Sequence, residues 1–223
     1  MPILGQAALG IWMDVVPEAE DELNTWYPQQ HLPERLAVPG FLRGRRYVSA
    51  GGAPKYFILY ETEGPEVLRS AAYLERLNNP TDWTRRVLPT MRNVVRNVYR
   101  FLCGAGREDG QAAVTLRLEP VPGAEPALRA RYRAEVLEAM TRVPGVASAA
   151  LFEAEAAATG VITEERKLVG AMAAAPTFLC MCELRDPEAR AHPAWRSLTS
   201  PDGPARKDVV REVTENAYLT SAS

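Results

Sequence analysis

The segment "PKYFILYETEGPEVLRSAAY" at residues 54–73 lines up without a gap on "PTFLCMCELRDPEARAHPAW" at residues 176–195, at a constant offset of 122. The matched pairs include Pro54 with Pro176, Glu61 with Glu183 and Tyr73 with Trp195. Upstream, "VPGF" at 38–41 is echoed by "VPGV" at 143–146, an offset of 105; downstream, "NVYR" at 97–100 is echoed by "NAYL" at 216–219, an offset of 119. A repeat spaced at about half the chain predicts two copies of one structural unit.

The first copy is predicted to fold in the order βαββαβ. Residues 10–16 are short, apolar and partly β-branched, which favours a strand, and Pro17 with the acidic run after it opens a helix. Residues 41–50 and 55–61 form a hairpin across "GGAP", a second helix begins at Pro65, and residues 93–102 form the last strand. This order is typical of the ferredoxin-like unit, an antiparallel sheet with both helices on one face.

The second copy repeats the scaffold from residue 112, and "GAGRED" at 104–109 is predicted to be the linker. The predicted fold class is therefore α+β: two tandem ferredoxin-like units, residues 1–105 and 106–223, packed sheet to sheet as an intramolecular α/β barrel with a ligand cavity between them. An insertion at 153–175 interrupts the second hairpin. It either folds over a cavity mouth or makes an oligomer contact.

Composition excludes several function classes. The net charge of −2 without a basic block gives no electrostatic footprint for nucleic acid. The apolar start of the chain is broken by Gly5, Gly10 and Asp14, so no membrane-spanning segment is expected there. Three cysteines without C-x-x-C spacing are predicted to be reduced, which indicates a cytoplasmic location.

His31 is the predicted acid/base residue, because imidazole titrates nearest to neutral pH. Tyr27 lies four residues earlier, on the same helical face, and is predicted to act with it. The alternative is that His31 is only a helix-end cap or a hydrogen-bonded core residue. His192 has no polar residues beside it in the sequence and is expected to be structural or exposed. Because the two histidines are not accompanied by clustered carboxylates or cysteines, no metal site is predicted.

Strand alternation predicts which side chains bind substrate in the cavity between the units. Phe57 and Leu59 match an apolar pair in the second copy and are assigned to the helix-covered face, which leaves Tyr56, Ile58 and Tyr60 toward the cavity. In the neighbouring strand, one face would place Arg46 beneath the helices and the other would place two arginines there. The set Arg43, Arg45 and Tyr47 is therefore assigned to the cavity. The alternative is that these side chains are packing residues and that the arginines lie on a solvated edge.

Two tryptophans complete the predicted binding set. Trp26 and Trp83 have rings that suit stacking on a planar substrate, although a tryptophan is more often a core anchor. Glu61 and Glu183 recur at one scaffold position, which predicts a structural role such as accepting a hydrogen bond at a strand end.

The run "WYPQQHLPERLAVPGFLRGRRY" at residues 26–47 resembles the EthD-like branch of the dimeric α/β-barrel superfamily. The pattern shared with that branch is an aromatic pair, a histidine after a short spacer, and a Pro-Gly turn into the second strand. The resemblance covers the first half well, whereas the second half keeps the scaffold without the histidine. It implies one fused chain in place of a homodimer, and a superfamily that includes polyketide ring cyclases, lactone isomerases, cofactor-free monooxygenases and haem-binding tandem forms.

Two function classes follow. The first is a cofactor-independent lyase, cyclase or isomerase that acts on an aromatic, phenolic or polyketide-like anion, with His31 as acid/base and the tyrosines and arginines orienting the substrate. The second is a ligand-binding, haem-binding or assembly module without chemistry of its own. The expected partner is a small molecule, with a homodimer as a further option; neither nucleic acid nor a membrane is expected.

Overall fold

The structure is a computed structural model that describes residues 3–49, 51–155 and 161–220. The chain divides into two compact units. The first unit, as the term is used below, consists of Leu4–Arg100 with Glu155–Ala175; the second unit consists of Phe101–Ala154 with Pro176–Thr220 and Ile3. The segment 155–175 therefore leaves the second half of the sequence and packs with the first. The predicted boundary at residue 105 and the sheet-to-sheet packing stay predictions.

The first unit is built on an antiparallel sheet. Its strands are β1 (Ala7–Val15), β2 (Phe41–Ser49), β3 (Tyr56–Thr62) and β4 (Met91–Gly106), in the spatial order β2–β3–β1–β4. The short β7 (Ala173–Ala174) from segment 155–175 runs parallel to β4, opposite Val95 and Arg96. This segment thus extends the sheet at its β4 edge.

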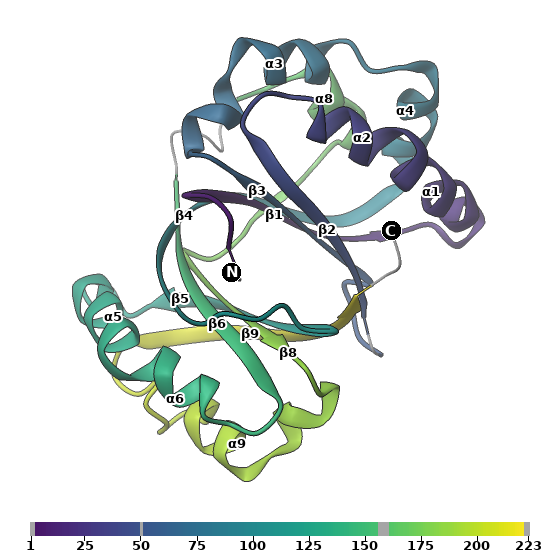
Figure 1. Ribbon diagram of the computed structural model, residues 1–223. Coiled ribbons are helices and arrows are strands. Elements are labelled where there is room, and N and C mark those ends of the chain that lie inside the picture. The colour runs from purple at the N-terminus through teal and green to yellow at the C-terminus, as the bar shows by residue number, and fades with distance from the viewer. Residues whose placement is uncertain (1–2, 50, 156–160, 221–223) are drawn as a thin grey trace. The chain divides into compact units, whose positions relative to one another are not determined.

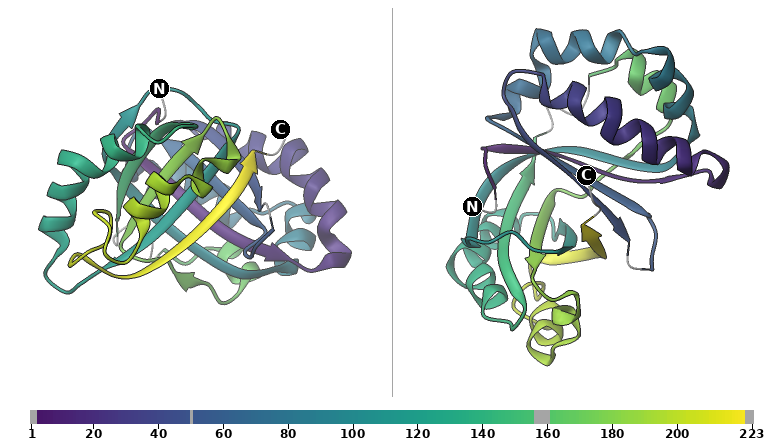
Figure 2. Two further views of the ribbon diagram at one scale, coloured as in Figure 1. Left: turned by 90° about the horizontal axis from the view of Figure 1, so that it is seen from below. Right: turned by 45° about the vertical axis from the view of Figure 1, so that its right-hand side comes forward.

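Helices cover one face of this sheet (Figure 1; Figure 2, right). The first helical run consists of a 3₁₀ turn (Pro17–Ala19), α1 (Glu20–Trp26), a π-helical turn (Tyr27–His31) and α2 (Leu32–Leu36). The second consists of a 3₁₀ turn (Pro65–Arg69), α3 (Ala71–Asn78), α4 (Asp82–Val87) and a 3₁₀ turn (Leu88–Thr90). The α8 helix (Glu164–Val169) of segment 155–175 lies on the same side.

Side-chain caps fix where these helices begin. The Ser70 hydroxyl accepts from the Tyr73 amide at the start of α3, and the Thr81 hydroxyl accepts from the Thr84 amide at the start of α4. Thr163 caps α8 in the same way. Each cap satisfies an amide that has no partner within the helix, as expected for hydroxyl residues at the N-cap.

The second unit has the same order. It contains β5 (Ala112–Pro120), α5 (Glu125–Arg131), a π-helical turn (Tyr132–Val136), α6 (Leu137–Thr141), β6 (Val146–Ala154) and β8 (Phe178–Leu184). A 3₁₀ turn (Pro187–Ala191), α9 (Pro193–Thr199) and β9 (Val210–Thr220) complete it. The strand order is β9–β5–β8–β6, which is the arrangement of the first unit.

Strand registers confirm the three predicted offsets. Ala7 pairs with Thr62 and Arg100, whereas Ala112 pairs with Leu184 and Leu219, so the equivalent positions are 105, 122 and 119 residues apart. Both hairpins also carry a register shift at the same place, between Phe41 and Arg43 and between Val146 and Ser148. The predicted βαββαβ order and α+β class are confirmed for both units. No helix of the described residues is long and apolar enough to cross a membrane.

The two recurring glutamates have the predicted structural role. Glu61 accepts a hydrogen bond from the backbone N–H of Leu4, and Glu183 accepts one from that of Gly110, in each case just before the first strand of a unit. Both carboxylates are buried. They satisfy amides that the sheet leaves unpaired at its end.

The predicted faces of β3 were wrong. Tyr56, Ile58 and Tyr60 pack in the core beneath the helices, whereas the Phe57 ring stacks on Trp12 at 4.9 Å on the opposite face of the sheet. Every side chain of β3 is buried, so neither face carries the polar residues that would mark it as outward. Alternation therefore separated the two sets correctly but could not orient them.

Candidate functional site

A pocket lies inside the first unit, between the helix-covered face of the sheet and the helices. Its cavity has a volume of about 80 Å³. The partly exposed lining residues belong to β1, β4 and segment 155–175, so the pocket opens on that side. The lining residues are Leu9, Ile11, Met13, Trp26, Tyr27, His31, Arg35, Ile58, Tyr60, Tyr73, Leu77, Leu88, Met91, Val94, Arg96, Glu165, Arg166, Val169 and Met172.

A π-helical turn positions Tyr27 and His31 at the pocket. The amide of Leu32 bonds to the carbonyl of Tyr27, five residues back, so the turn is one residue wider than an α-helical turn. The second unit has the same feature, in which Leu137 bonds to Tyr132. Because that turn contains no proline, Pro28 is not its cause. The tyrosine and the wide turn belong to the shared scaffold, and the histidine is particular to the first unit.

His31 is a buried, neutral imidazole. Its ring lies 4.2 Å from the Trp26 ring and 5.8 Å from the Tyr27 ring, measured between centroids. Burial, with a further contribution from the nearby Arg35 cation, holds the His31 pKa well below its usual 6.5. The Nδ1 atom is buried and has no hydrogen-bond partner among the described residues. At neutral pH the imidazole is uncharged, so one of its two ring nitrogens carries no proton and can accept one.

Two tyrosine hydroxyls share the pocket with His31. Burial raises the pKa of Tyr27 to about 12, partly offset by Tyr60 and Arg46, and raises the pKa of Tyr60 well above 10. The two hydroxyls are near enough to influence each other, yet within the described part of the chain neither makes a hydrogen bond of ordinary geometry. Both remain protonated at neutral pH and can donate a hydrogen bond to a ligand.

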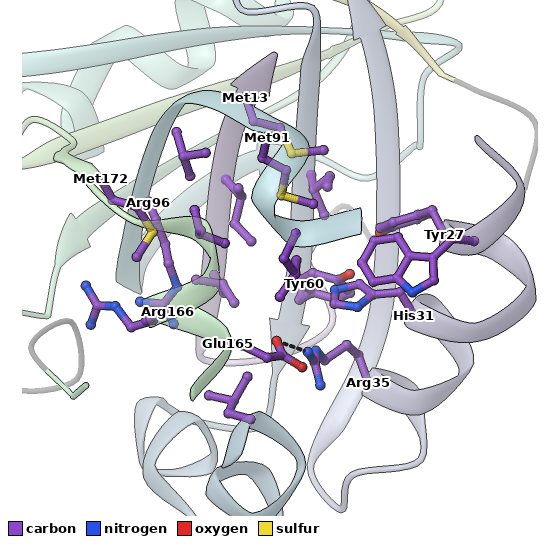
Figure 3. A pocket seen from close by; sticks show the side chains of 18 of the residues that line it. Met13, Tyr27, His31, Arg35, Tyr60, Met91, Arg96, Glu165, Arg166 and Met172 are labelled. Carbon is purple, nitrogen blue, oxygen red and sulfur yellow. Dashed lines mark hydrogen bonds and ion pairs between the residues drawn. The ribbon is translucent and has the colours of Figure 1, made fainter. Parts of the chain in front are cut away.

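An ion pair joins the helical wall to segment 155–175 (Figure 3). Arg35 on α2 binds the Glu165 carboxylate on α8, and the side chains are only 3% and 10% exposed. Burial raises the Glu165 pKa, and the charge of Arg35 opposes that shift without cancelling it. The insertion therefore forms part of the wall of a pocket inside the first unit. The cavity mouth that it was predicted to cover lay between the two units, so neither of its two predicted roles is tested here. Residues 156–160 of the insertion lie outside the described residues.

The pocket also contains two further cations, Arg96 on β4 and Arg166 on α8 (Figure 3). The Nη1 atom of Arg96 is buried and finds no hydrogen-bond partner in the described chain. The Nη1 atom of Arg166 donates to the backbone carbonyl of Val161 at 2.7 Å.

The predicted site residues do not all meet in this pocket. Trp26, Tyr27, His31 and Tyr60 line it together. Arg43, Arg45 and Tyr47 belong to the opposite face of the sheet, so the strand prediction that grouped them with Tyr60 was wrong. Arg43 Nε and Arg45 Nη2 donate to Glu61 Oε1 at 2.8 and 3.0 Å, and the Tyr47 ring stacks on Phe57 at 5.5 Å.

Tyr56 and Trp83 lie near the pocket without lining it. The Tyr56 hydroxyl donates to Glu20 at 2.8 Å, and the Arg46 guanidinium lies 4.7 Å from the Tyr56 ring centre. The partly buried Trp83 packs against the core cluster. The Trp26 ring is held by a bond of 3.3 Å from its Nε1 to the Thr84 hydroxyl.

Four charged residues of the pocket were not predicted from the sequence. Arg35 stands one helical turn after His31, and Arg96 alternates with Val94 and Val98 on an otherwise apolar strand face, so periodicity offered a signal for both. Glu165 and Arg166 offered none, because only the fold of the insertion brings them to the first unit. Within the described residues, no group of three or more His, Cys, Asp or Glu side chains is arranged to hold a metal ion.

No protein-family model matches the sequence, and no curated protein is found as a relative. Solved structures match over nearly the whole chain. A candidate monooxygenase from Fusobacterium nucleatum is 11% identical with a TM-score of 0.57, covering 98% of this chain and 94% of its own. An anthrone oxidase-like protein is 12% identical with a TM-score of 0.58, covering 97% and 91%.

A third match is a mutant chlorite dismutase from Candidatus Nitrospira defluvii, solved in complex with cyanide. It is 11% identical with a TM-score of 0.54, covering 97% of this chain and 90% of that one. At such identities the similarity shows the fold alone. The chain therefore shares its overall fold with these solved structures.

Proposed function

We propose that the protein is a cofactor-independent enzyme that moves a proton on a small organic molecule bound in the first-unit pocket, with His31 as the general base. The observation that carries this proposal is the place of His31, which lines a cavity with Tyr27 and Tyr60 and whose buried Nδ1 has no partner in the described residues. A buried polar atom without a partner costs free energy in the empty pocket, and a bound ligand can satisfy it.

The proposed step removes a proton from a weakly acidic C–H or O–H of the ligand. His31 Nδ1 takes the proton and becomes imidazolium, and the electron pair left on the ligand moves to its oxygen as an enolate or phenolate. The protonated hydroxyls of Tyr27 and Tyr60 donate hydrogen bonds to that oxygen, where negative charge develops. Return of the proton to a different atom completes an isomerisation, and departure of a leaving group with its electron pair completes an elimination. In a cyclisation, the carbon of the anion attacks a carbonyl of the same molecule, and the carbonyl oxygen takes the proton from His31.

Aromatic or polyketide-like substrates suit the walls of the pocket, which are mainly apolar. Size is a constraint, because an engineered cavity of about 150 Å³ accepts benzene and the cavity here is about half as large. Three methionines, Met13, Met91 and Met172, line the pocket. Their flexible thioethers can change rotamer to admit a ring at modest cost.

Haem binding fits these residues poorly. A macrocycle needs far more space than about 80 Å³, and the His31 ring, the candidate axial ligand, is packed between the Trp26 and Tyr27 rings. A carrier of small ligands without chemistry remains the second candidate, favoured by the depressed pKa of His31, which makes the imidazole a weak base until a ligand alters its surroundings.

Hydrogen–deuterium exchange separates the two candidates. Small phenols, β-keto acids and aryl carboxylic acids are incubated with the protein in D₂O, and loss of the acidic C–H signal is followed by NMR. We expect exchange above the buffer rate for at least one compound, its loss in His31→Gln and its retention in His192→Gln. A compound that binds in the pocket and exchanges equally fast with His31→Gln contradicts the enzyme and favours the carrier.

We also infer that the two units are copies of one ancestral unit, and that the chain is related to the EthD-like branch. The matching strand registers and the two π-helical turns support the duplication. Under this inference, one copy kept the histidine while the other supplied, through its insertion, the cover of the pocket. Pairing of two chains as a homodimer stays a prediction.

A further inference from the structure

We propose that Arg35 is a further ligand-binding residue of the first-unit pocket, and that its Nη1 donates a hydrogen bond to a carbonyl or hydroxyl oxygen of the ligand. This inference rests on the proposed function for the place of the site, but it requires no reaction. It adds a third donor to the hydroxyls of Tyr27 and Tyr60, and it predicts that the pocket distinguishes ligands by an oxygen atom at this position.

The two terminal nitrogens of the Arg35 guanidinium have different surroundings. Nη2 donates to the Glu165 carboxylate, whereas Nη1 is buried and has no hydrogen-bond partner among the described residues. The central carbon of the guanidinium lies 5.9 Å from the centre of the Tyr73 ring, which is a contact with a ring and not a hydrogen bond. A buried N–H of a charged group without an acceptor costs free energy, and a ligand oxygen can recover that cost.

Arg35 lies in the part of the pocket that contains the proposed base. It stands one helical turn after His31, and both side chains line the cavity. Burial is the largest influence on the pKa of His31 and on that of Tyr60, and the nearby charge of Arg35 lowers both, so the three groups lie close together. Figure 3 shows Arg35 on the side of the pocket where His31 and Tyr60 lie. An oxygen that accepts from Arg35 would therefore lie beside the base.

The charge of Arg35 is already matched in the empty pocket. Glu165 binds it, and the same carboxylate also acts on Arg96. Arg35 therefore offers a ligand a directed N–H and not an excess of positive charge. An uncharged oxygen can accept from it, and negative charge that develops on this oxygen during a reaction would strengthen the bond.

The second unit shows that the scaffold does not need an arginine at this place. Arg35 corresponds to Met140 at the offset of 105 that relates the two π-helical turns, and Tyr60 corresponds to Cys182 at the same sheet position. Met140 is fully buried, and its sulfur lies 3.6 Å from the sulfur of Cys182. An apolar side chain thus suffices for packing there. The ion pair with Glu165 accounts for Nη2 of Arg35 but not for the buried Nη1.

Binding of two matched aromatic compounds tests this inference. 4-Fluorophenol is uncharged at pH 7 and carries a hydroxyl oxygen, whereas fluorobenzene lacks that oxygen; both affinities are measured by fluorine NMR titration at this pH. We expect the wild-type protein to bind 4-fluorophenol about tenfold or more tightly than fluorobenzene. In Arg35→Met/Glu165→Leu, which leaves no unpaired charge, the affinity for 4-fluorophenol should fall about tenfold while that for fluorobenzene stays unchanged.

A second variant keeps the test valid if the double variant does not fold. Arg35→Lys retains a cation that can pair with Glu165 but replaces the planar fork by a single nitrogen, so it should also lose most of the preference for 4-fluorophenol and keep its affinity for fluorobenzene. Arg76→Gln is the matched control, because Arg76 is an exposed arginine of α3 in the same unit, and it should bind both compounds as the wild type does.

Three results overturn the inference: equal affinity of the wild type for the two compounds, no binding of either, or a preference for 4-fluorophenol that persists in Arg35→Lys. A preference that depends on Arg35, in a protein that promotes no hydrogen–deuterium exchange, would leave the oxygen site standing while the proposed chemistry fails. Exchange that depends on His31, with equal binding of the two compounds, would do the reverse.

Discussion

The ion pair between Arg35 and Glu165 offers a quantitative test of how segment 155–175 is held on the first unit. Glu165→Leu removes the carboxylate and leaves the Arg35 guanidinium buried without its partner. Because the two side chains are only 3% and 10% exposed, the loss should be that of a broken buried pair, about 3–5 kcal/mol. Against a total stability of about 5–15 kcal/mol for a natural domain, this is a large fraction.

The double variant Arg35→Met/Glu165→Leu should recover most of that loss. Replacing both partners by apolar side chains of similar volume leaves no unpaired charge and is often neutral or stabilising. We therefore expect a coupling energy at or above the upper end of the roughly 0.5–3 kcal/mol measured between contacting residues. Urea unfolding at pH 8, followed by circular dichroism, is measured for the wild type, the two single variants and the double variant. The four free energies of unfolding give the coupling energy.

The dependence on pH adds a second check. Since burial raises the Glu165 pKa, the folded protein binds this proton more readily than the unfolded chain does, so the carboxyl favours folding at acidic pH and loses that contribution as pH rises through its raised pKa. Arg35→Met should consequently cost less at pH 5 than at pH 8. Lys167→Met, which breaks an exposed pair with Glu164 on the same helix, is the control and should not shift the midpoint. Additive single variants would refute the account of the pair as the anchor of segment 155–175.

Three further predictions concern the first unit. Because the His31 pKa lies below 6.5, kcat/KM should fall only as the pH drops below that value. Over the same acid range, His31→Gln should lose less stability than the wild type, because His31 takes up a proton in the unfolded chain that the folded imidazole resists. Tyr27→Phe should lower kcat about tenfold to a hundredfold with little change in KM, because the developing oxyanion loses one hydrogen-bond donor. Ionisation of the Tyr27 hydroxyl should cause no fall in the wild-type kcat below about pH 10. Glu61→Gln should cost about 3–5 kcal/mol in urea unfolding, because it breaks a buried charge cluster and weakens a backbone bond; exposed Glu63→Gln is its control.

The internal repeat made most of the fold predictable. Proline positions, the recurring glutamates and the offsets placed nearly every strand and helix, because both units obey the same local rules. Orientation of β3 could not be predicted, since Tyr56 and Phe57 begin two alternating sets that are both buried and both rich in aromatic rings. The pattern of a strand reveals its outward face only when that face is polar.

The candidate site was predictable only in its helical half. Tyr27 and His31 share a helix, so their spacing alone predicts that they meet. Arg43 and Arg45 were predicted at the substrate because the two faces of their strand were assigned the wrong way round. They bind Glu61, which was predicted to be structural. Glu165 reaches the pocket through segment 155–175, which crosses from the second half of the chain, and no local pattern encodes such a crossing.

The protonation state of His31 tests the central claim most directly. Long-range nitrogen–proton NMR of the two imidazoles, with His192→Gln used for assignment, reports which His31 nitrogen is protonated as pH is lowered. If His31 is the neutral base of the pocket, it remains uncharged at pH 6.5 with an unprotonated Nδ1. The NMR signal of this nitrogen should then shift when benzoate is added. A His31 ring that is already protonated at pH 6.5, or whose Nδ1 carries the proton, would contradict the assignment of this nitrogen as the base.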